Sequence, residues 1–145
     1  MISVMTSEKA INNQVKDKGK IIIISGPSGV GKGSVIKEII KWSPRLHVSV
    51  SATTRPKREG ETHQRDYYFL TDAEFDQKIQ ENEFLEWCNV HQHRYGTIRE
   101  ITKAKLNLNQ SVILEVDVQG AKKVMNYCQL HQQDYVSIFI IPPTL

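Results

Sequence analysis

The chain has 145 residues, with 19 lysines and arginines against 16 aspartates and glutamates, so its formal net charge at pH 7 is +3 with its five histidines neutral. This length suits one domain with a buried core, and 39% hydrophobic with 24% charged residues is the composition of a folded globular protein rather than of a disordered tail. So small and mixed a charge does not indicate a nucleic-acid-binding protein, and any anionic ligand has to be inferred from local groups of residues.

Residues 1–19 predict a polar, flexible leader, because charged side chains interrupt them and they lack the apolar stretch that a signal peptide needs. The longest apolar run, at residues 21–24, is far too short to cross a bilayer. Cys88 and Cys128 are too few for a disulfide framework, which favours a reducing compartment. We therefore expect a cytoplasmic protein that does not bind a membrane.

Strands alternate with helices along the rest of the chain. The four isoleucines at 21–24 show no polar alternation, which is typical of a strand buried on both faces of a parallel sheet. After a glycine-rich loop, helical periodicity predicts a helix with the apolar face Val35, Ile36, Ile39 and Ile40. Strands are predicted near 47–51 and 67–70, and capping boxes at 71–74 and 97–100 each predict the start of a helix. A strand at 112–117, a helix near 121–128 and a strand at 135–141 follow.

This order of elements predicts an α/β fold, a P-loop three-layer sandwich with a mostly parallel sheet. Residues 51–97 break the alternation with short strands and one helix, which indicates an inserted mixed α+β lobe. The core of the fold would then consist of residues 20–50 and 98–145.

The glycine-rich loop reads Gly26-x-x-x-x-Gly31-Lys32 and stands between a strand and a helix, the context that a phosphate-binding loop requires. Glycines let backbone amides converge on phosphate oxygens, the helix start adds positive potential, and the lysine reaches the outer phosphates. A glycine-rich turn with an incidental lysine is the alternative, and it explains neither flanking element. The predicted phosphate-binding residues are Gly26, Pro27, Ser28, Gly29, Val30, Gly31, Lys32, Gly33 and Ser34.

The residue after Lys32 is Gly33, where a serine or threonine commonly touches magnesium. We therefore expect no direct side-chain ligand for Mg²⁺, which phosphate oxygens and waters would hold instead.

Glu115 and Asp117 stand near the end of the apolar strand predicted at 112–117. Residues two apart in a strand face the same side, so both carboxylates should point into the crevice at the carboxyl ends of the parallel strands. One could orient magnesium-bound waters and the other could bind a substrate. The alternative is a surface strand end with solvated acids.

A second anion site is predicted from Arg55 and Arg58, which lie too far along the chain to belong to the glycine-rich loop. Two guanidinium groups on a proline-stiffened loop suit bidentate capture of a phosphate, and the hydroxyls of Tyr67 and Tyr95 could add donors. The alternative is a solvated basic loop with core tyrosines.

The spacing Cys88-x-x-His91-x-His93 resembles a metal site, but no fourth ligand is evident in the sequence. We expect these residues to occupy hydrated strand or loop positions.

Six segments, in this order and spacing, resemble the guanylate kinase family over residues 20–143. They are Gly-Pro-Ser-Gly-Val-Gly-Lys-Gly-Ser (26–34), Ser-Ala-Thr-Thr-Arg-Pro-Lys-Arg-x-Gly-Glu (51–61), Asp-Tyr-Tyr-Phe (66–69), Glu-Phe-Leu-Glu-Trp (83–87), Tyr-Gly-Thr (95–97) and Leu-Glu-Val-Asp-Val-Gln-Gly-Ala (114–121). The resemblance implies an enzyme of purine metabolism that transfers the γ-phosphoryl group of ATP to GMP, giving ADP and GDP, with Mg²⁺ accompanying ATP.

The resemblance also implies site residues, with the lobe at 51–97 binding GMP. It places the GMP phosphate on Arg55, Arg58, Tyr67 and Tyr95, and the guanine base among Ser51, Glu86, Thr97 and Asp117. Carboxylates suit guanine because its N1–H and exocyclic amine are donors, whereas adenine would leave buried carboxylates unpaired. The implied catalytic residues, which act by positioning and charge stabilisation without a protein nucleophile, are Lys32, Arg55 and, near magnesium-bound waters, Glu115.

Two other functions compete with this interpretation. A non-catalytic guanylate-kinase-like module that binds a protein partner would have no use for Lys32 or for the pair Glu115 and Asp117. A P-loop GTPase predicts an Asn-Lys-x-Asp loop, which the sequence lacks, and it leaves the second anion site unexplained.

The family's pattern continues past the two prolines at 142–143, whereas this sequence stops at Leu145. We expect the lid helices, whose arginines clamp the ATP phosphates, and another core strand to be missing. The chain alone should then show weak or absent turnover and an exposed sheet edge. The sequence determines neither the oligomeric state nor the acceptance of dGMP.

Overall fold

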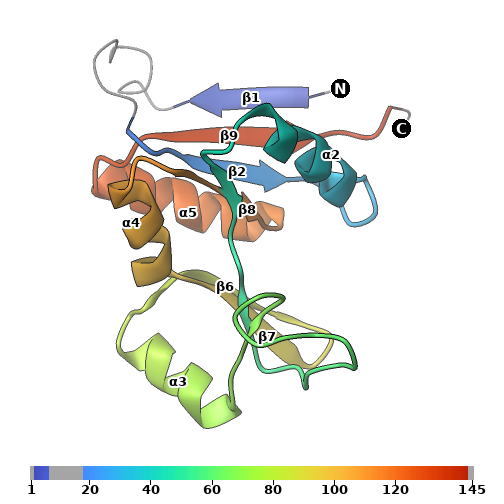
Figure 1. Ribbon diagram of the computed structural model, residues 1–145, viewed down its shortest axis with the longest axis vertical. Helices are drawn as coiled ribbons and strands as arrows, with labels where there is room; N and C mark the ends of the chain where they lie inside the picture. Colours follow the sequence, from blue (N-terminus) through green and yellow to red (C-terminus); the bar gives the residue numbers. More distant parts are fainter. Residues whose placement is uncertain (1, 7–17, 144–145) are drawn as a thin grey trace. The chain divides into compact units, whose positions relative to one another are not determined.

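The computed structural model describes residues 2–6 and 18–143 (Figure 1). Its elements are β1 (Ile2–Thr6), β2 (Ile21–Ser25), α2 (Lys32–Ile39), the 3₁₀ helix η1 (Ile40–Trp42), β3 (Leu46–Val48), β4 (Ala52–Thr53), β5 (Tyr68–Phe69), α3 (Asp72–Gln80), β6 (Phe84–Val90), β7 (His93–Ile98), α4 (Arg99–Asn107), β8 (Ser111–Glu115), α5 (Val118–Leu130) and β9 (Tyr135–Ile140). They divide into two compact units. The core unit takes the chain up to Ser49 and from Lys103 onward, and the lobe is Val50–Thr102.

The core unit is built on a five-stranded sheet with the strand order β1-β9-β2-β8-β3. β2 pairs in parallel with both β8 and β9, and β3 pairs in parallel with β8. This central position explains the uninterrupted apolar run of β2, in which Ile21, Ile23 and Ile24 are no more than 1% exposed.

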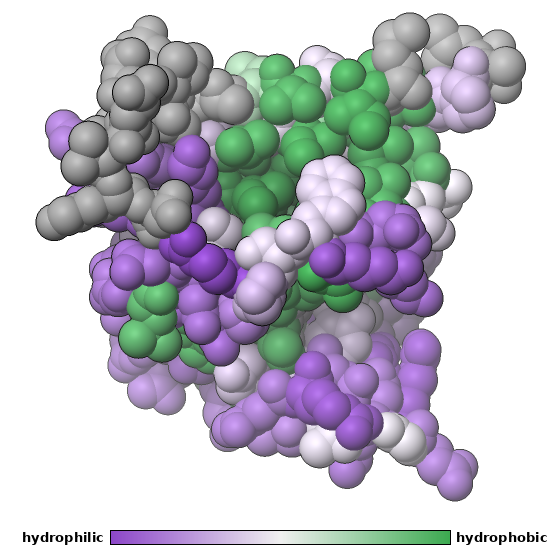
Figure 2. Space-filling view, turned by 45° about the horizontal axis from the view of Figure 1, so that its top comes forward, coloured by the Kyte–Doolittle hydropathy of each residue, from purple (hydrophilic) through white to green (hydrophobic). Residues whose placement is uncertain are grey.

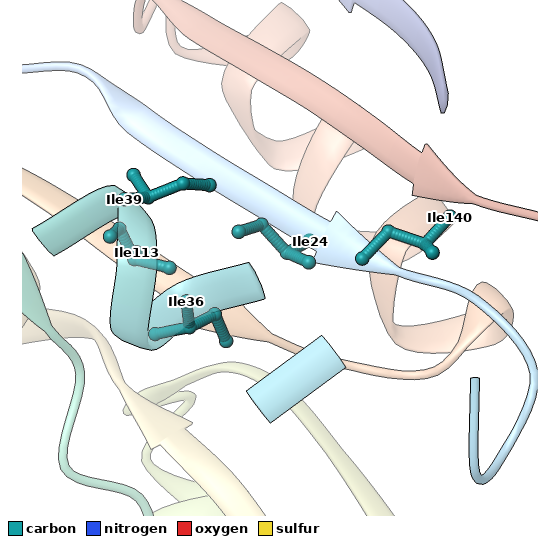
Figure 3. Close-up of a cluster of buried hydrophobic side chains, with 5 residues drawn as sticks. All are labelled: Ile24, Ile36, Ile39, Ile113 and Ile140. Carbon is teal, nitrogen blue, oxygen red and sulfur yellow. The ribbon is translucent and has the colours of Figure 1, made fainter. Parts of the chain in front are cut away.

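Helices cover the two faces of this sheet. Ile36 and Ile39 of α2 pack against Ile24, Ile113 and Ile140, which come from three neighbouring strands (Figure 3). On the other face, α5 contacts β2 and β9 and buries Ala121, Val124 and Cys128. Ile40, expected on the apolar face of α2, is 39% exposed because the α-helix ends one residue earlier. The predicted α/β fold with helices on both faces of a mostly parallel sheet is confirmed.

β1 corrects the prediction of a flexible leader for the residues that form it. It pairs antiparallel with β9 in the register Ile2↔Ile140 to Thr6↔Val136, so it covers the free edge of β9 and becomes the edge of the sheet itself. Ile2 and Val4 remain 55% and 56% exposed, and hydrophobic side chains gather on the surface over this part of the sheet (Figure 2). Strand formation here depends on a distant backbone partner, which local composition does not reveal. Residues 7–17 of the predicted leader lie outside the described residues.

The lobe contains a four-stranded sheet of mixed direction, with the order β5-β4-β7-β6, and α3 packs against one of its faces. Fully buried Phe75 of α3 packs with Ala52, Phe84 and Ile98. The predicted capping box at the start of α3 is confirmed, because Thr71 and Glu74 exchange both side-chain-to-backbone hydrogen bonds. The lobe extends to Thr102, beyond the predicted 51–97, since Ile101 of α4 joins the same apolar cluster.

Within the described residues, no helix is both long enough and apolar enough to span a membrane.

Candidate functional site

The loop predicted to bind phosphates, called the phosphate loop below, joins β2 to α2 in the core unit. A Cβ at Gly26 would lie 2.6 Å from the carbonyl oxygen of Ile140, so only glycine fits there. Gly31 precedes α2 with φ of 100°, a left-handed conformation, and no side chain caps the helix. The amides of the first turn are thus available to an anion, and no acidic residue lies in that turn.

Lys32 lies over this loop. Its Nζ donates hydrogen bonds to the carbonyl oxygens of Gly26 at 2.9 Å and Pro27 at 3.5 Å. Both partners are loop carbonyls rather than carboxylates, so no acidic side chain neutralises the ammonium in these contacts. The loop therefore combines backbone donors with a positive charge, the arrangement that binds phosphates.

Glu115 ends β8 at the same edge of the sheet as the phosphate loop. It is the register partner of Ile24, and the amide of Val116 donates to the Ile24 carbonyl at 3.1 Å. Its carboxylate is exposed. A carboxylate beside a phosphate loop can hold the waters of a metal ion that accompanies the phosphates.

Asp117 lies outside the strand in which it was predicted. β8 ends at Glu115, and Asp117 is the N-cap of α5, where its side chain accepts a hydrogen bond from the Gly120 amide at 2.7 Å. The expectation that strand alternation aligns the two carboxylates is therefore wrong. The Asp117 side chain is oriented instead by its hydrogen bond to an unpaired backbone amide in the first turn of α5.

In the lobe, one face of the sheet carries polar side chains. Glu86 pairs with Thr97, and Cys88 pairs with Tyr95, whereas the alternate residues Trp87 and Gly96 face the α3 side. The Thr97 hydroxyl donates to Oε1 of Glu86 at 2.8 Å, and the two residues are only 2% and 7% exposed. The lobe thus presents a buried carboxylate–hydroxyl pair.

The helix predicted to open with a capping box at 97–100 begins at Arg99. Thr97 belongs to β7, and its hydroxyl donates across the sheet to Glu86. The sequence pattern is local, but a cross-strand partner decides where the hydroxyl points.

Arg55, Tyr67 and Tyr95 come together beside this pair. The Arg55 guanidinium lies 5.1 Å from the centroid of the Tyr67 ring, and the centroids of Tyr67 and Tyr95 are 6.0 Å apart. Arg55 is 8% exposed and donates to the Pro56 carbonyl at 3.0 Å. Three of the four residues predicted to bind a phosphate therefore form one cluster, while Arg58 follows on the same loop with an exposed side chain.

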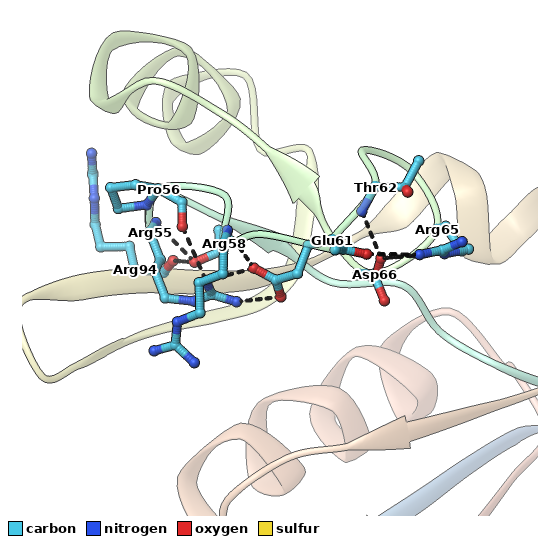
Figure 4. Close-up of polar contacts among 10 residues, drawn as sticks. Arg55, Pro56, Arg58, Glu61, Thr62, Arg65, Asp66 and Arg94 are labelled. Atoms are coloured by element: carbon cyan, nitrogen blue, oxygen red, sulfur yellow. Dashed lines mark hydrogen bonds and ion pairs between the residues drawn. The ribbon is translucent and has the colours of Figure 1, made fainter.

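Glu61 fixes the Arg55 guanidinium, a role that the sequence did not reveal. Nη1 and Nη2 of Arg55 donate to the two carboxylate oxygens of Glu61, each at 2.8 Å, and the Arg58 amide donates to Oε1 at 2.7 Å (Figure 4). Hydrogen bonding by Arg55, and then by the Arg58 amide, lowers the pKa of Glu61 to about 2. The same carboxylate raises the pKa of Arg55 above its ordinary value. The available signal was an acid in the same arginine-rich loop as Arg55, but Glu59 and Asp66 lie in that loop too.

This contact predicts an acid transition. Because the folded-state pKa of Glu61 lies below its ordinary value of 4.5, its contribution to stability is complete above about pH 4.5 and is lost as the pH falls toward about 2. Glu61→Gln should therefore flatten the fall in melting temperature across this range. Circular dichroism melts of both proteins test this, and parallel curves would contradict it.

The predicted site residues fall into two groups. The core unit holds the phosphate loop, Glu115 and Asp117. The lobe holds Ser51, Arg55, Arg58, Tyr67, Glu86, Tyr95 and Thr97. Ser51, directly before β4, is partly buried, and its carbonyl accepts a hydrogen bond from the Tyr68 amide.

Comparisons with known proteins relate the chain to one family. The family model described as guanylate kinase matches residues 18–145. The chain is 43% identical to guanylate kinase of Thermotoga maritima over 127 residues, which is 88% of this chain and 59% of that protein. It is 44% identical to guanylate kinase of Thermobifida fusca over 133 residues, which is 92% of this chain and 64% of that protein.

Among solved structures, the crystal structure of guanylate kinase from Anaplasma phagocytophilum is similar, with a TM-score of 0.65 and 32% identity over 86% of this chain and 61% of that chain. The chain spans about three fifths of the length of these relatives.

Proposed function

Because this chain belongs to the guanylate kinase family, we propose that the protein transfers the γ-phosphoryl group of ATP to GMP and releases ADP and GDP. One observation carries the proposal. On the polar face of the lobe, the buried pair Glu86–Thr97 is followed two residues along β7 by Tyr95, which lies beside Tyr67 and Arg55. A buried acceptor next to a guanidinium–tyrosine cluster suits a guanine base joined to a phosphate.

Glu86 and Thr97 would select the base. Guanine presents its N1–H and exocyclic amine as donors, and a carboxylate offers several acceptor positions, of which Thr97 uses one on Glu86. The hydroxyl of Ser51 would donate to the O6 atom, and Asp117 of the core unit would be a further acceptor. Adenine lacks the N1–H donor, so the Glu86 carboxylate, only 7% exposed, would keep its hydrogen bond from Thr97 but gain none from N1 of the base.

Positioning and charge stabilisation account for the chemistry. Arg55, Arg58, Tyr67 and Tyr95 would hold the GMP phosphate, while Lys32 and the loop amides would hold the outer phosphates of ATP. An oxygen of the GMP phosphate then attacks the γ-phosphorus, and the bond from that phosphorus to the β–γ bridging oxygen breaks. Lys32 stabilises the charge that develops on the transferring group, and no protein nucleophile takes part.

Residues of the core unit fit a magnesium ion that is bound mainly through ATP. Gly33 offers no hydroxyl ligand after Lys32, whereas the exposed carboxylate of Glu115, at the same sheet edge as the loop, can hold metal-bound waters. When bound, the ion would neutralise charge on the phosphates. We also propose that this activity operates in the cytoplasm, with which the free thiols of Cys88 and Cys128 agree.

The test measures ADP release from ATP and Mg²⁺ with GMP, AMP, CMP or UMP supplied singly. We expect slow release with GMP and release at least about 100-fold slower with the other three, because none of them offers a ring N–H next to an exocyclic amine to the buried carboxylate. GMP binding is measured by calorimetry in parallel, since the proposed lobe contacts all lie within this chain. An equal response to AMP, or the absence of both turnover and binding with GMP, would contradict the proposal.

A further inference from the structure

A pocket of about 530 Å³ opens in the lobe. Its lining includes Arg55, Arg58 and Tyr95, three of the residues proposed for the GMP phosphate. Lys57, His91 and His93 also line it, together with Pro56 and Val90. His93 and Tyr95 lie two residues apart in β7, so they share a face of the sheet. Thr97, Tyr95 and His93 are therefore successive side chains on one face of β7, and His93 is the one farthest along the strand from the buried Glu86–Thr97 pair.

The charge around this pocket is positive and only partly compensated. None of its lining residues is acidic. Glu61, the carboxylate that reaches the neighbouring loop, is engaged with both terminal nitrogens of Arg55. Within the described residues, the exposed Lys57 side chain forms no ion pair, whereas Arg58 attracts the Glu61 carboxylate without forming a close ion pair. The next residue on β7, Arg94, pairs with Asp72 and Asp76 of α3 and so does not add to this excess.

We propose that Lys57, His91 and His93 form a second anion subsite beside the GMP-phosphate position, for a tetrahedral dianion of the phosphate or sulfate class. The subsite rests on the proposed function, since Arg55, Arg58, Tyr67 and Tyr95 define the first position. Its ligand is either a free anion or a further phosphate group on a guanine nucleotide. Both sources present the same oxygens to the same cationic groups.

Sulfate is the cleanest probe of this subsite, because it is a tetrahedral dianion whose charge is fixed near neutral pH. The experiment follows the imidazole signals of the chain by NMR during a sulfate titration at one fixed pH. We expect the signals of His91 and His93 to move saturably and to give the same dissociation constant. His131, in the core unit, is the internal control. Lys57→Gln should weaken binding about 3-fold, and Lys37→Gln, on exposed α2 surface, should leave it unchanged.

Two further arms identify the source of the anion. With GMP at saturation, sulfate should still move the signals of His91 and His93, because the subsite is separate from the first phosphate position. GDP without sulfate should move them only if the second phosphate of a nucleotide is the natural occupant, and a free anion is assigned if it does not.

The proposal is overturned if His91 and His93 respond to sulfate no more than His131 does, if Lys57→Gln leaves the affinity unchanged, or if GMP abolishes the response. Failure of the proposed function looks different. In that case GMP does not bind, while the sulfate response of the two histidines persists.

Discussion

Arg55→Ala should lower the affinity of the chain for GMP by about 100-fold, the effect of losing two charge-assisted hydrogen bonds to the phosphate. Arg55 is the most buried cation of the lobe cluster, and its guanidinium is held by Glu61 and stacked near Tyr67. Alanine would also leave the Glu61 carboxylate without its partner, close to the incoming phosphate. Calorimetric titration with GMP measures the loss. Arg65→Ala is the matched control, because Arg65 lies on the same loop but pairs with Asp66 at the surface.

Two more variants separate binding from folding. Arg55→Lys keeps the charge but loses the planar fork, so we expect an intermediate loss of about 10-fold. Arg55→Ala combined with Glu61→Ala removes the stranded carboxylate and should recover part of the thermal stability without recovering GMP affinity. If Arg55→Ala binds GMP as well as Arg65→Ala does, the assigned phosphate position is wrong.

Lys32→Ala should reduce the rate of ADP formation with GMP by about 100- to 1000-fold, since the variant loses a positive charge that stabilises the transferring phosphoryl group. The hydrogen bonds of Lys32 go to two loop carbonyls, so we expect the melting temperature to change little. GMP affinity should stay the same, because the lobe residues are intact. Lys37→Ala on the exposed side of α2 is the control, and an equal effect of the two substitutions would contradict the role of Lys32.

The features predicted well from sequence share one property, which is that neighbouring residues specify them. The phosphate loop needs particular backbone angles at Gly31 and space at Gly26, and both demands appear directly as glycines. The capping box of α3 is formed by Thr71 and Glu74, three residues apart. The burial of β2 follows from a run of isoleucines that no exposed strand would carry.

The features that were missed or placed wrongly depend on residues far apart in the chain. β1 exists because β9 offers its backbone edge more than a hundred residues later. The hydrogen bond from the Thr97 hydroxyl to Glu86 joins two strands and was not predicted. The orientation of Asp117 follows from where β8 ends and α5 begins, which periodicity places only to within a few residues.

The sequence by itself thus determined the phosphate loop, the alternation of strands and helices, and the residue types that suit a guanine nucleotide. Only the tertiary structure decided that Glu61 holds Arg55, that Glu86 and Thr97 form a buried pair, and that His91 and His93 line one pocket with Lys57. The physical reason is the range of the interactions. Backbone angles and helix caps are set within a few residues, whereas ion pairs and cross-strand contacts exist only once the sheet has brought their partners together.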